Sequence, residues 1–177
     1  MNLVRTHRLV WIALLAACIA AGAWIQLPLG PVPFTLQPLF AFLAGFLLGP
    51  LGGPAAVLLY LAAGVLGLPV FAGGASGLGV LFGPTGGYLA GFVLAAAVTG
   101  LAHGRAALTW ARGLAFGAAA LAVAYAAGVL QLRAALALGW RAALVAGVAP
   151  FVLQDLAKVA LAVATARFLG SHRLAPP

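Results

Sequence analysis

Asp155 and Lys158 are the two residues whose types and spacing point most clearly to chemistry. They are the one acidic residue and the one lysine of the 177-residue chain, and both lie in an apolar run near its C-terminus. Placing either charge in a membrane helix costs a few kcal/mol, so such residues normally face a bundle interior. A spacing of three puts both on one helix face. We favour a ligand site near the N-terminus of a helix that follows Pro150, where the helix dipole favours a carboxylate. The alternative is a structural ion pair, in which the two charges only neutralise each other.

Other catalytic patterns are missing from the sequence. It has no GxxxxGK[ST] phosphate-binding loop, no second carboxylate, no HExxH motif and no group of cysteines. We expect His7, His103 and His172 to lie in termini or loops, and Cys18 to be a small packing residue. The chain is therefore predicted not to be an enzyme and to carry no metal or cofactor.

Composition predicts a membrane protein. Hydrophobic residues make up 66% of the chain and charged residues 6%, and the mean hydropathy is +1.20. Soluble domains carry roughly a quarter charged residues. We expect a single transmembrane domain over residues 1–177, with no soluble domain. The net charge of +8 comes from basic residues that are scattered singly, which argues against a nucleic-acid partner.

Six apolar runs must position this pair of residues. Each run is predicted to be a membrane span. These runs are Leu9–Leu27, Leu36–Leu48, Pro54–Leu68, Tyr88–Leu101, Leu114–Leu130 and Pro150–Leu169. Several are shorter than the ~20 residues that a span needs. Irregular backbone at membrane depth is tolerated only where it is buried or lines a cavity. The fold class predicted is all-α, with six transmembrane helices and outer loops that dip inward over a substrate cavity.

The loops and small residues suggest further contacts. The glycine-rich stretch from Pro69 to Gly87 is too broken for a regular helix, and Phe71, Phe82 and Tyr88 could line a pocket beside it. The connection Leu132–Ala149 could form a short interfacial helix. Two sets of regularly spaced small residues are predicted to be packing faces: Ala13, Ala17 and Ala21, and Gly91 with Ala95.

Six spans place both termini on one side of the membrane. The basic residues assigned to that side are Arg5, Arg8, Arg105, Arg112, Arg167 and Arg173, against Arg133 and Arg141 on the other side. Basic residues concentrate in cytoplasmic loops, so both termini are predicted to be cytoplasmic in a bacterial cytoplasmic membrane. The first run also fits a cleavable signal peptide. We favour a membrane span over a signal peptide for this run, because further predicted spans follow it directly in the sequence.

Several motifs resemble the BioY family, the biotin-specific substrate-capture (S) components of energy-coupling factor (ECF) transporters. They are Pro31–Gln37, Leu43–Gly45, Leu48–Pro50, Gly67–Gly74, Gly83–Tyr88, and Pro150-Phe151 followed by Asp155 and Lys158. The region 105–149 matches only in being apolar. The family pattern has a glycine before the aspartate, where this chain has Gln154.

The resemblance implies that the chain captures biotin from outside and works with a transmembrane scaffold subunit and two cytoplasmic ATPases in the lipid bilayer. Asp155 would accept from a ureido N–H and Lys158 would donate to the ureido oxygen, or Lys158 would instead meet the biotin carboxylate. The full set of implied substrate-binding residues is Asp155, Lys158, Tyr88, Ser76, Gly73, Gly74, Phe71, Thr35 and Gln37.

Three other functions compete with this interpretation. The chain could be a solitary biotin transporter, or a sister vitamin S component without a dedicated energy module. It could be a membrane enzyme that uses His103 and Asp155, although the predicted topology places these on opposite sides. It could also be a packing subunit without a ligand, which would leave the glycine-rich loop and the charged pair unexplained.

Overall fold

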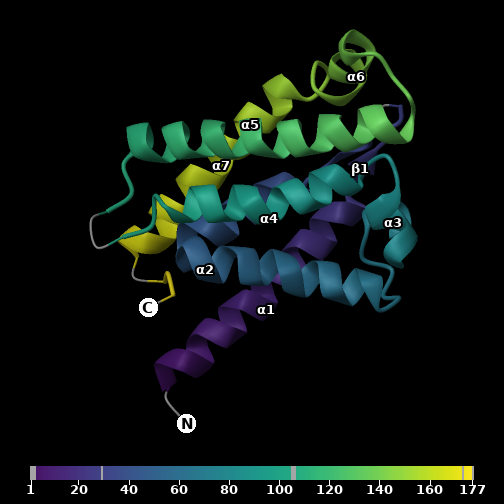
Figure 1. Ribbon diagram of the computed structural model, residues 1–177. Helices are drawn as coiled ribbons and strands as arrows, with labels where there is room; N and C mark the ends of the chain where they lie inside the picture. The colour runs from purple at the N-terminus through teal and green to yellow at the C-terminus, as the bar shows by residue number, and fades with distance from the viewer. Residues whose placement is uncertain (1–2, 29, 105–106, 173, 177) are drawn as a thin grey trace.

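The structure is a computed structural model that describes residues 3–28, 30–104, 107–172 and 174–176. The expectations for Arg105 and Arg173 fall outside these residues. Helices account for most of the described chain (Figure 1). The elements are α1 (Leu3–Trp24), β1 (Gln26–Leu27), β2 (Phe34–Thr35), α2 (Gln37–Val65), η1 (Ala72–Gly74), α3 (Leu78–Phe82), α4 (Gly86–Gly100), α5 (Trp110–Ala135), α6 (Trp140–Gly147) and α7 (Val152–Ser171).

The element α2 is two helices that fold back on each other. Gly49 has φ 78° and ψ −175°, which breaks the helix just before Pro50. Gln37 and Tyr60 would lie about 35 Å apart in a straight helix, yet the Gln37 amide donates to the Tyr60 hydroxyl at 2.6 Å. The two halves, residues 37–48 and 50–65, are therefore antiparallel. The predicted separation into two helices is right, but the second begins at Pro50 rather than Pro54.

The other predicted apolar runs coincide with helices, with shifted ends. The helix α5 is longer than the predicted run Leu114–Leu130, because Arg112 and Arg133 lie inside its terminal turns rather than in loops. It begins after Thr109, whose hydroxyl accepts from the Arg112 amide. The glycine-rich stretch is irregular, as expected, apart from the short helices η1 and α3. The connection before α7 contains the helix α6.

Length and composition support a membrane protein. Within the described residues, α1 and α5 are each long and apolar enough to cross a bilayer, as is α2 when its two halves are counted together, and α6 with α7 adds a further candidate across a 49° bend. The helix α4 is apolar but shorter. Large apolar side chains such as Leu58 and Leu161 are exposed on the outside of the bundle. An apolar exterior of this kind is suited to contact with lipid chains.

Small residues let the helices approach closely. The helix α4 packs between α2 and α5 (Figure 1), and a Cβ at Gly91 would lie 2.9 Å from the Ala124 Cα of α5. The predicted packing face at Gly91 and Ala95 is therefore confirmed. The face formed by Ala13, Ala17 and Ala21 is exposed on α1. Its predicted role in packing within the chain is wrong, because α1 turns other residues, Ile19 among them, toward α2.

The bundle has two distinct ends. At the end where α2 reverses, Arg8 donates to the Leu48 carbonyl, and Pro176 lines a hollow with Arg8 and His103. Arg8 of α1 and the C-terminal end of the described chain therefore lie near this reversal. The strands β1 and β2, the helices α3 and α6 and the start of α7 lie toward the opposite end (Figure 1).

The close approach of the two halves of α2 gives a stability prediction. A Cβ at Gly53 would lie 2.6 Å from the Cα and 2.8 Å from the N of Gly45, and backbone atoms cannot move aside cheaply. We expect Gly53→Ala to lower the free energy of unfolding by about 1–3 kcal/mol through overpacking. Thermal unfolding in detergent measures the change. The matched control is Gly170→Ala in α7, where a Cβ meets nothing within 4 Å. Equal stability of the two variants would contradict the antiparallel packing.

Candidate functional site

A cavity of about 200 Å³ lies inside the bundle, between the start of α7 and the segments that precede α2 and α4. Its lining is mostly apolar, with a few polar groups, as in small-molecule sites. The lining residues are Val32, Pro33, Phe34, Thr35, Gln37, Pro38, Phe42, Phe71, Ala72, Ala75, Val80, Thr85, Tyr88, Leu89, Phe92, Leu121, Ala124, Tyr125, Phe151, Asp155 and Lys158.

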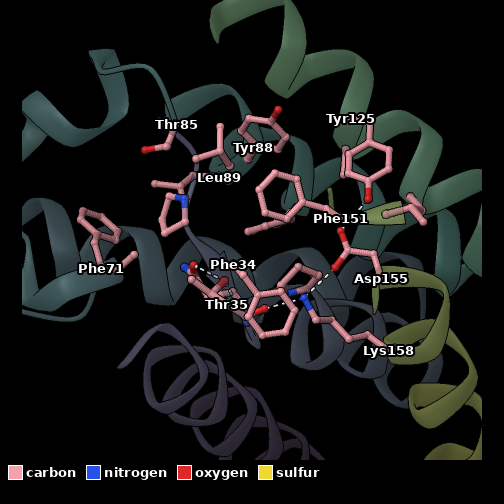
Figure 2. A pocket seen from close by; sticks show the side chains of 18 of the residues that line it. Phe34, Thr35, Phe71, Thr85, Tyr88, Leu89, Tyr125, Phe151, Asp155 and Lys158 are labelled. Atoms are coloured by element: carbon pink, nitrogen blue, oxygen red, sulfur yellow. Dashed lines mark hydrogen bonds and ion pairs between the residues drawn. The ribbon is translucent and has the colours of Figure 1, made fainter. Parts of the chain in front are cut away.

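Asp155 and Lys158 form an ion pair at one side of this cavity. The Lys158 Nζ lies 2.6 Å from Asp155 Oδ1, and each residue is 5% exposed. Asp155 lies in the first turn of α7, where the positive end of the helix dipole stabilises a carboxylate. Figure 2 shows both side chains extending from α7 toward the cavity. The expectation that the pair faces the bundle interior is confirmed, and there is an open cavity beside it.

Lys158 also fixes the segment before α2. Its ammonium donates to the Thr35 backbone carbonyl at 2.6 Å and lies 3.8 Å from the centre of the Phe34 ring. The pairing of β1 with β2 places Leu27 opposite Phe34 and holds this segment in position. An ammonium above an aromatic face is stabilised by the ring quadrupole. The lysine therefore joins α7 to a segment more than 120 residues away in sequence.

The second oxygen of Asp155 is held by Tyr125 of α5. The Tyr125 hydroxyl donates to Oδ2 at 2.7 Å, and Figure 2 shows it aimed at the carboxylate. A carboxylate has about four lone-pair sites, so Asp155 can accept from a further donor. Sequence reasoning missed Tyr125. The available signal was a single hydroxyl-bearing residue in the middle of the fifth apolar run.

Thr35 and Gln37 form a second polar group in the lining. The Thr35 hydroxyl donates to Gln37 Oε1 at 2.9 Å, and the Gln37 amide donates to Tyr60. Both residues are buried. Because these side chains satisfy one another, they fix the shape of the cavity beside Lys158.

Aromatic rings supply much of the apolar surface. Phe71 packs edge-on against Tyr60 with 5.5 Å between ring centres. The Tyr88 hydroxyl donates to the Gly147 carbonyl at 2.8 Å, which joins α4 to α6. Phe151 lines the cavity just ahead of α7. Phe71 and Thr85 lie on the far side of the cavity from the ion pair (Figure 2).

Six of the nine residues expected at the site line this cavity and three do not. Those in the lining are Asp155, Lys158, Tyr88, Phe71, Thr35 and Gln37. Gly73 and Gly74 are in a turn with φ of +71° and +75°, where a Cβ would approach Gln26 and Trp24, and Ser76 is exposed. The glycine-rich loop reaches the cavity through Ala72 and Ala75 instead.

Phe82 does not lie beside the pocket, contrary to the prediction from the sequence, because it is 80% exposed on α3. The short helix α3 turns Val80 toward the cavity and Phe82 outward. Residues that the sequence did not single out for the site include Phe34, Thr85 and Phe151. They belong to segments whose approach to the cavity depends on the tertiary fold.

The arrangement suits binding rather than bond-breaking. A cation and an anion lie side by side in an apolar cavity, which fits a compact group with both donors and acceptors on an apolar body. His103 bonds to the Phe46 carbonyl near the reversal of α2 and does not line this cavity, so the pair needed by the enzyme alternative is not assembled. The described residues hold no cluster of three or more His, Cys, Asp or Glu that could bind a metal.

Comparison with known proteins gives one consistent result. The model of the BioY family matches residues 1–174. The chain is 46% identical to the biotin transporter BioY of Thermotoga maritima over 157 residues, which cover 88% of this chain and 91% of that protein. It is 39% identical to the biotin transporter BioY of Rhodobacter capsulatus, with 92% of each chain covered.

A solved structure shares the fold. The crystal structure of the S-component for biotin from an ECF-type ABC transporter matches with a TM-score of 0.87 and 25% sequence identity. The match covers 97% of this chain and 94% of that one.

Proposed function

The chain belongs to the BioY family, and from this membership we propose that it captures biotin as the substrate-binding component of an ECF-type transporter. It is a biotin transport protein and not an enzyme. The main support for the proposed site is the buried Asp155–Lys158 ion pair, which lines an apolar cavity.

Biotin matches this cavity in its distribution of polar groups. Its ureido ring has two N–H donors and one carbonyl acceptor, and its thiophane ring and chain are apolar. We place the ureido ring at α7, where Asp155 accepts from an N–H and Lys158 donates to the carbonyl oxygen. Charge-assisted hydrogen bonds of this kind are about twice as strong as neutral ones. Phe34, Tyr88 and Phe151 pack against the apolar thiophane ring and chain.

The opposite orientation would bring the biotin carboxylate to Lys158. Because Asp155 lies 2.6 Å from that ammonium, the two carboxylates would then share one buried site. Like charges so close disfavour each other's ionised forms. We therefore propose that the carboxylate of biotin lies on the side of Phe71 and Thr85, away from Asp155.

The first prediction concerns affinity. We expect Asp155→Asn and Lys158→Ala each to raise the Kd for biotin at least tenfold, which corresponds to the loss of about 1.4 kcal/mol. Isothermal titration of the purified protein measures the change, with thermal unfolding confirming that each variant is folded. Unchanged affinity in both variants would refute the site.

Two controls accompany this measurement. Ser76→Ala should leave the Kd unchanged, because Ser76 is exposed and lies outside the cavity lining. Biotin at 100 times its Kd should add about 2.7 kcal/mol to the unfolding free energy, and thiamine or riboflavin should add none. A shift with either of those vitamins would favour a sister vitamin component instead.

The second prediction tests the orientation of the ligand. Biotin methyl ester keeps the ureido ring but carries no carboxylate charge. If Lys158 donates to the ureido oxygen, Lys158→Ala should weaken binding of biotin and of the ester by the same factor. If Lys158 instead binds the carboxylate, the ester should be insensitive to the substitution. Titration of both ligands into both proteins forms a complete double-variant cycle.

We also propose six membrane spans, with both termini in the cytoplasm of a bacterium and the cavity open toward the outside, in a single transmembrane domain. The two antiparallel halves of α2 supply two of these spans. The described arginines support the orientation. Arg8, Arg112 and Arg167 bond to carbonyls near the α2 reversal or in the α4–α5 connection, whereas Arg133 and Arg141 lie toward the cavity end. Cytoplasmic segments are the ones enriched in Lys and Arg.

Uptake needs an energy source that this chain lacks, because its sequence has no phosphate-binding loop of the GxxxxGK[ST] type. We propose that a transmembrane scaffold subunit and two cytoplasmic ATPases supply it. On this chain, the exposed face of Ala13, Ala17 and Ala21 on α1 supports a helical partner. Small residues allow membrane helices to approach closely.

The third prediction separates assembly from capture. We expect Ala17→Leu to reduce co-purification of the scaffold and ATPase subunits from native membranes at least fivefold, while biotin affinity stays unchanged. The matched control is Ala118→Leu on α5, which is also exposed. Quantitative mass spectrometry of the purified complexes gives the readout. If no such subunits accompany the wild type, the chain transports biotin without this energy module.

A further inference from the structure

Gln131 makes two hydrogen bonds that the biotin contacts proposed above leave unexplained. Its side-chain nitrogen donates to the Leu81 and Gly83 carbonyls, each at 2.7 Å. Gln131 lies near the C-terminal end of α5 and does not line the cavity. One amide group thus joins a long helix to the end of the short helix α3, which lies at the same end of the molecule (Figure 1).

The segment that Gln131 holds contributes to the cavity. We define it as the α3 segment, residues 77–85. Val80 and Thr85 of this segment line the cavity, and Tyr88 follows it. Displacement of the α3 segment from α5 would therefore open the cavity on the side away from the ion pair.

Val80 and Leu81 pack partly buried against the core, and beyond these two side chains the α3 segment has few other sources of local stability. The side chains of Leu78 and Phe82 are 56% and 80% exposed. Several of its backbone hydrogen bonds, such as Val80 to Gly77 and Gly83 to Val80, stay within the segment, whereas the Gly77 amide at its start donates to the Gly64 carbonyl. A segment with little buried apolar surface opens at low free-energy cost. The Gln131 bonds therefore add to the core contacts of Val80 and Leu81 in keeping the segment closed.

The start of the loop is fixed separately. Trp24 donates to the Pro69 carbonyl at 3.1 Å, and the Gly77 amide donates to the Gly64 carbonyl at 2.8 Å. Beyond the segment, Gly87 packs so closely on α5 that a Cβ there would clash with the Ala127 carbonyl oxygen, and a Cβ at Gly86 would clash with the Leu81 carbonyl. Release of Gln131 would free the α3 segment between two fixed points.

We propose that Gln131 is a positioning residue that latches the α3 segment over the cavity and thereby sets the rate at which biotin enters and leaves. The latch rests on the proposed biotin site, but it makes no contact with the ligand. Because the latch closes the cavity with or without biotin, weakening it should speed both directions of exchange and leave the affinity nearly unchanged.

The test is the kinetics of biotin exchange in full-length protein in nanodiscs. Gln131→Met keeps the length of the side chain but removes both donors. We expect the association and dissociation rate constants, measured with radiolabelled biotin and a cold chase, each to rise at least fivefold while Kd changes less than twofold. Gln131→Lys restores a donor to the same carbonyls and should return both rates toward the wild type. Gln154→Met is the matched control, because Gln154 is exposed and outside the cavity lining.

The other outcomes overturn the latch. Unchanged rates in Gln131→Met would show that the two bonds do not limit exchange. A higher Kd at an unchanged association rate would show damage to the site rather than release of a latch. Gln131→Ala is the second variant if Gln131→Met does not fold, and failure of both to fold would make Gln131 purely structural. A wild type that binds no biotin overturns the proposed function, whereas biotin binding with unaltered exchange overturns only the latch.

Discussion

The burial of one ammonium and one carboxylate in an apolar bundle is the constraint on which the site depends. Neither charge can be left without a partner at that depth, and the structure satisfies both. Lys158 bonds to Asp155 and to the Thr35 carbonyl, and Asp155 also accepts from Tyr125. These contacts draw β2, α5 and α7 to a common point. The pair therefore organises the cavity as well as lining it.

The reversal of α2 gives the cavity a rigid apolar frame, in addition to the polar groups that the ion pair provides. Because Gly49 allows the chain to fold back, Gln37 and Tyr60 meet at the cavity end, and Tyr60 in turn supports Phe71. The glycine-rich loop is thereby held against a helix hairpin at one side. Helices set the polar groups on one side of the cavity, whereas loops with little buried surface form part of the other side. This division leaves the ion pair fixed while access to it can change.

Periodicity and composition predicted the features that depend on local sequence. The one-turn spacing of Asp155 and Lys158, the break near Pro50 and the irregular glycine-rich stretch were all readable in the sequence. The roles of Tyr125 and of the Thr35 carbonyl were not, because both arise from contacts between distant segments. The exposure of Ala17 and Phe82 was missed for the same reason. Spacing gives a helix face, but only packing decides whether that face meets another helix, lipid or a partner.

A mutual ion pair is well suited to a site that must alternate between empty and loaded states. In the empty cavity each charge is paired with its neighbour. An unpaired buried charge would cost several kcal/mol, and the ion pair avoids that cost. A ureido group has donors for the carboxylate and an acceptor for the ammonium, so it can share in both charges without separating them. When biotin binds, polar contacts within the protein are therefore largely exchanged for polar contacts with the ureido group, and few are added. Affinity must then come mainly from the apolar surface that biotin buries against rings such as Phe34, Tyr88 and Phe151. The ion pair provides selectivity, because a ligand without the matching donors and acceptor leaves the polar groups of the cavity unpaired.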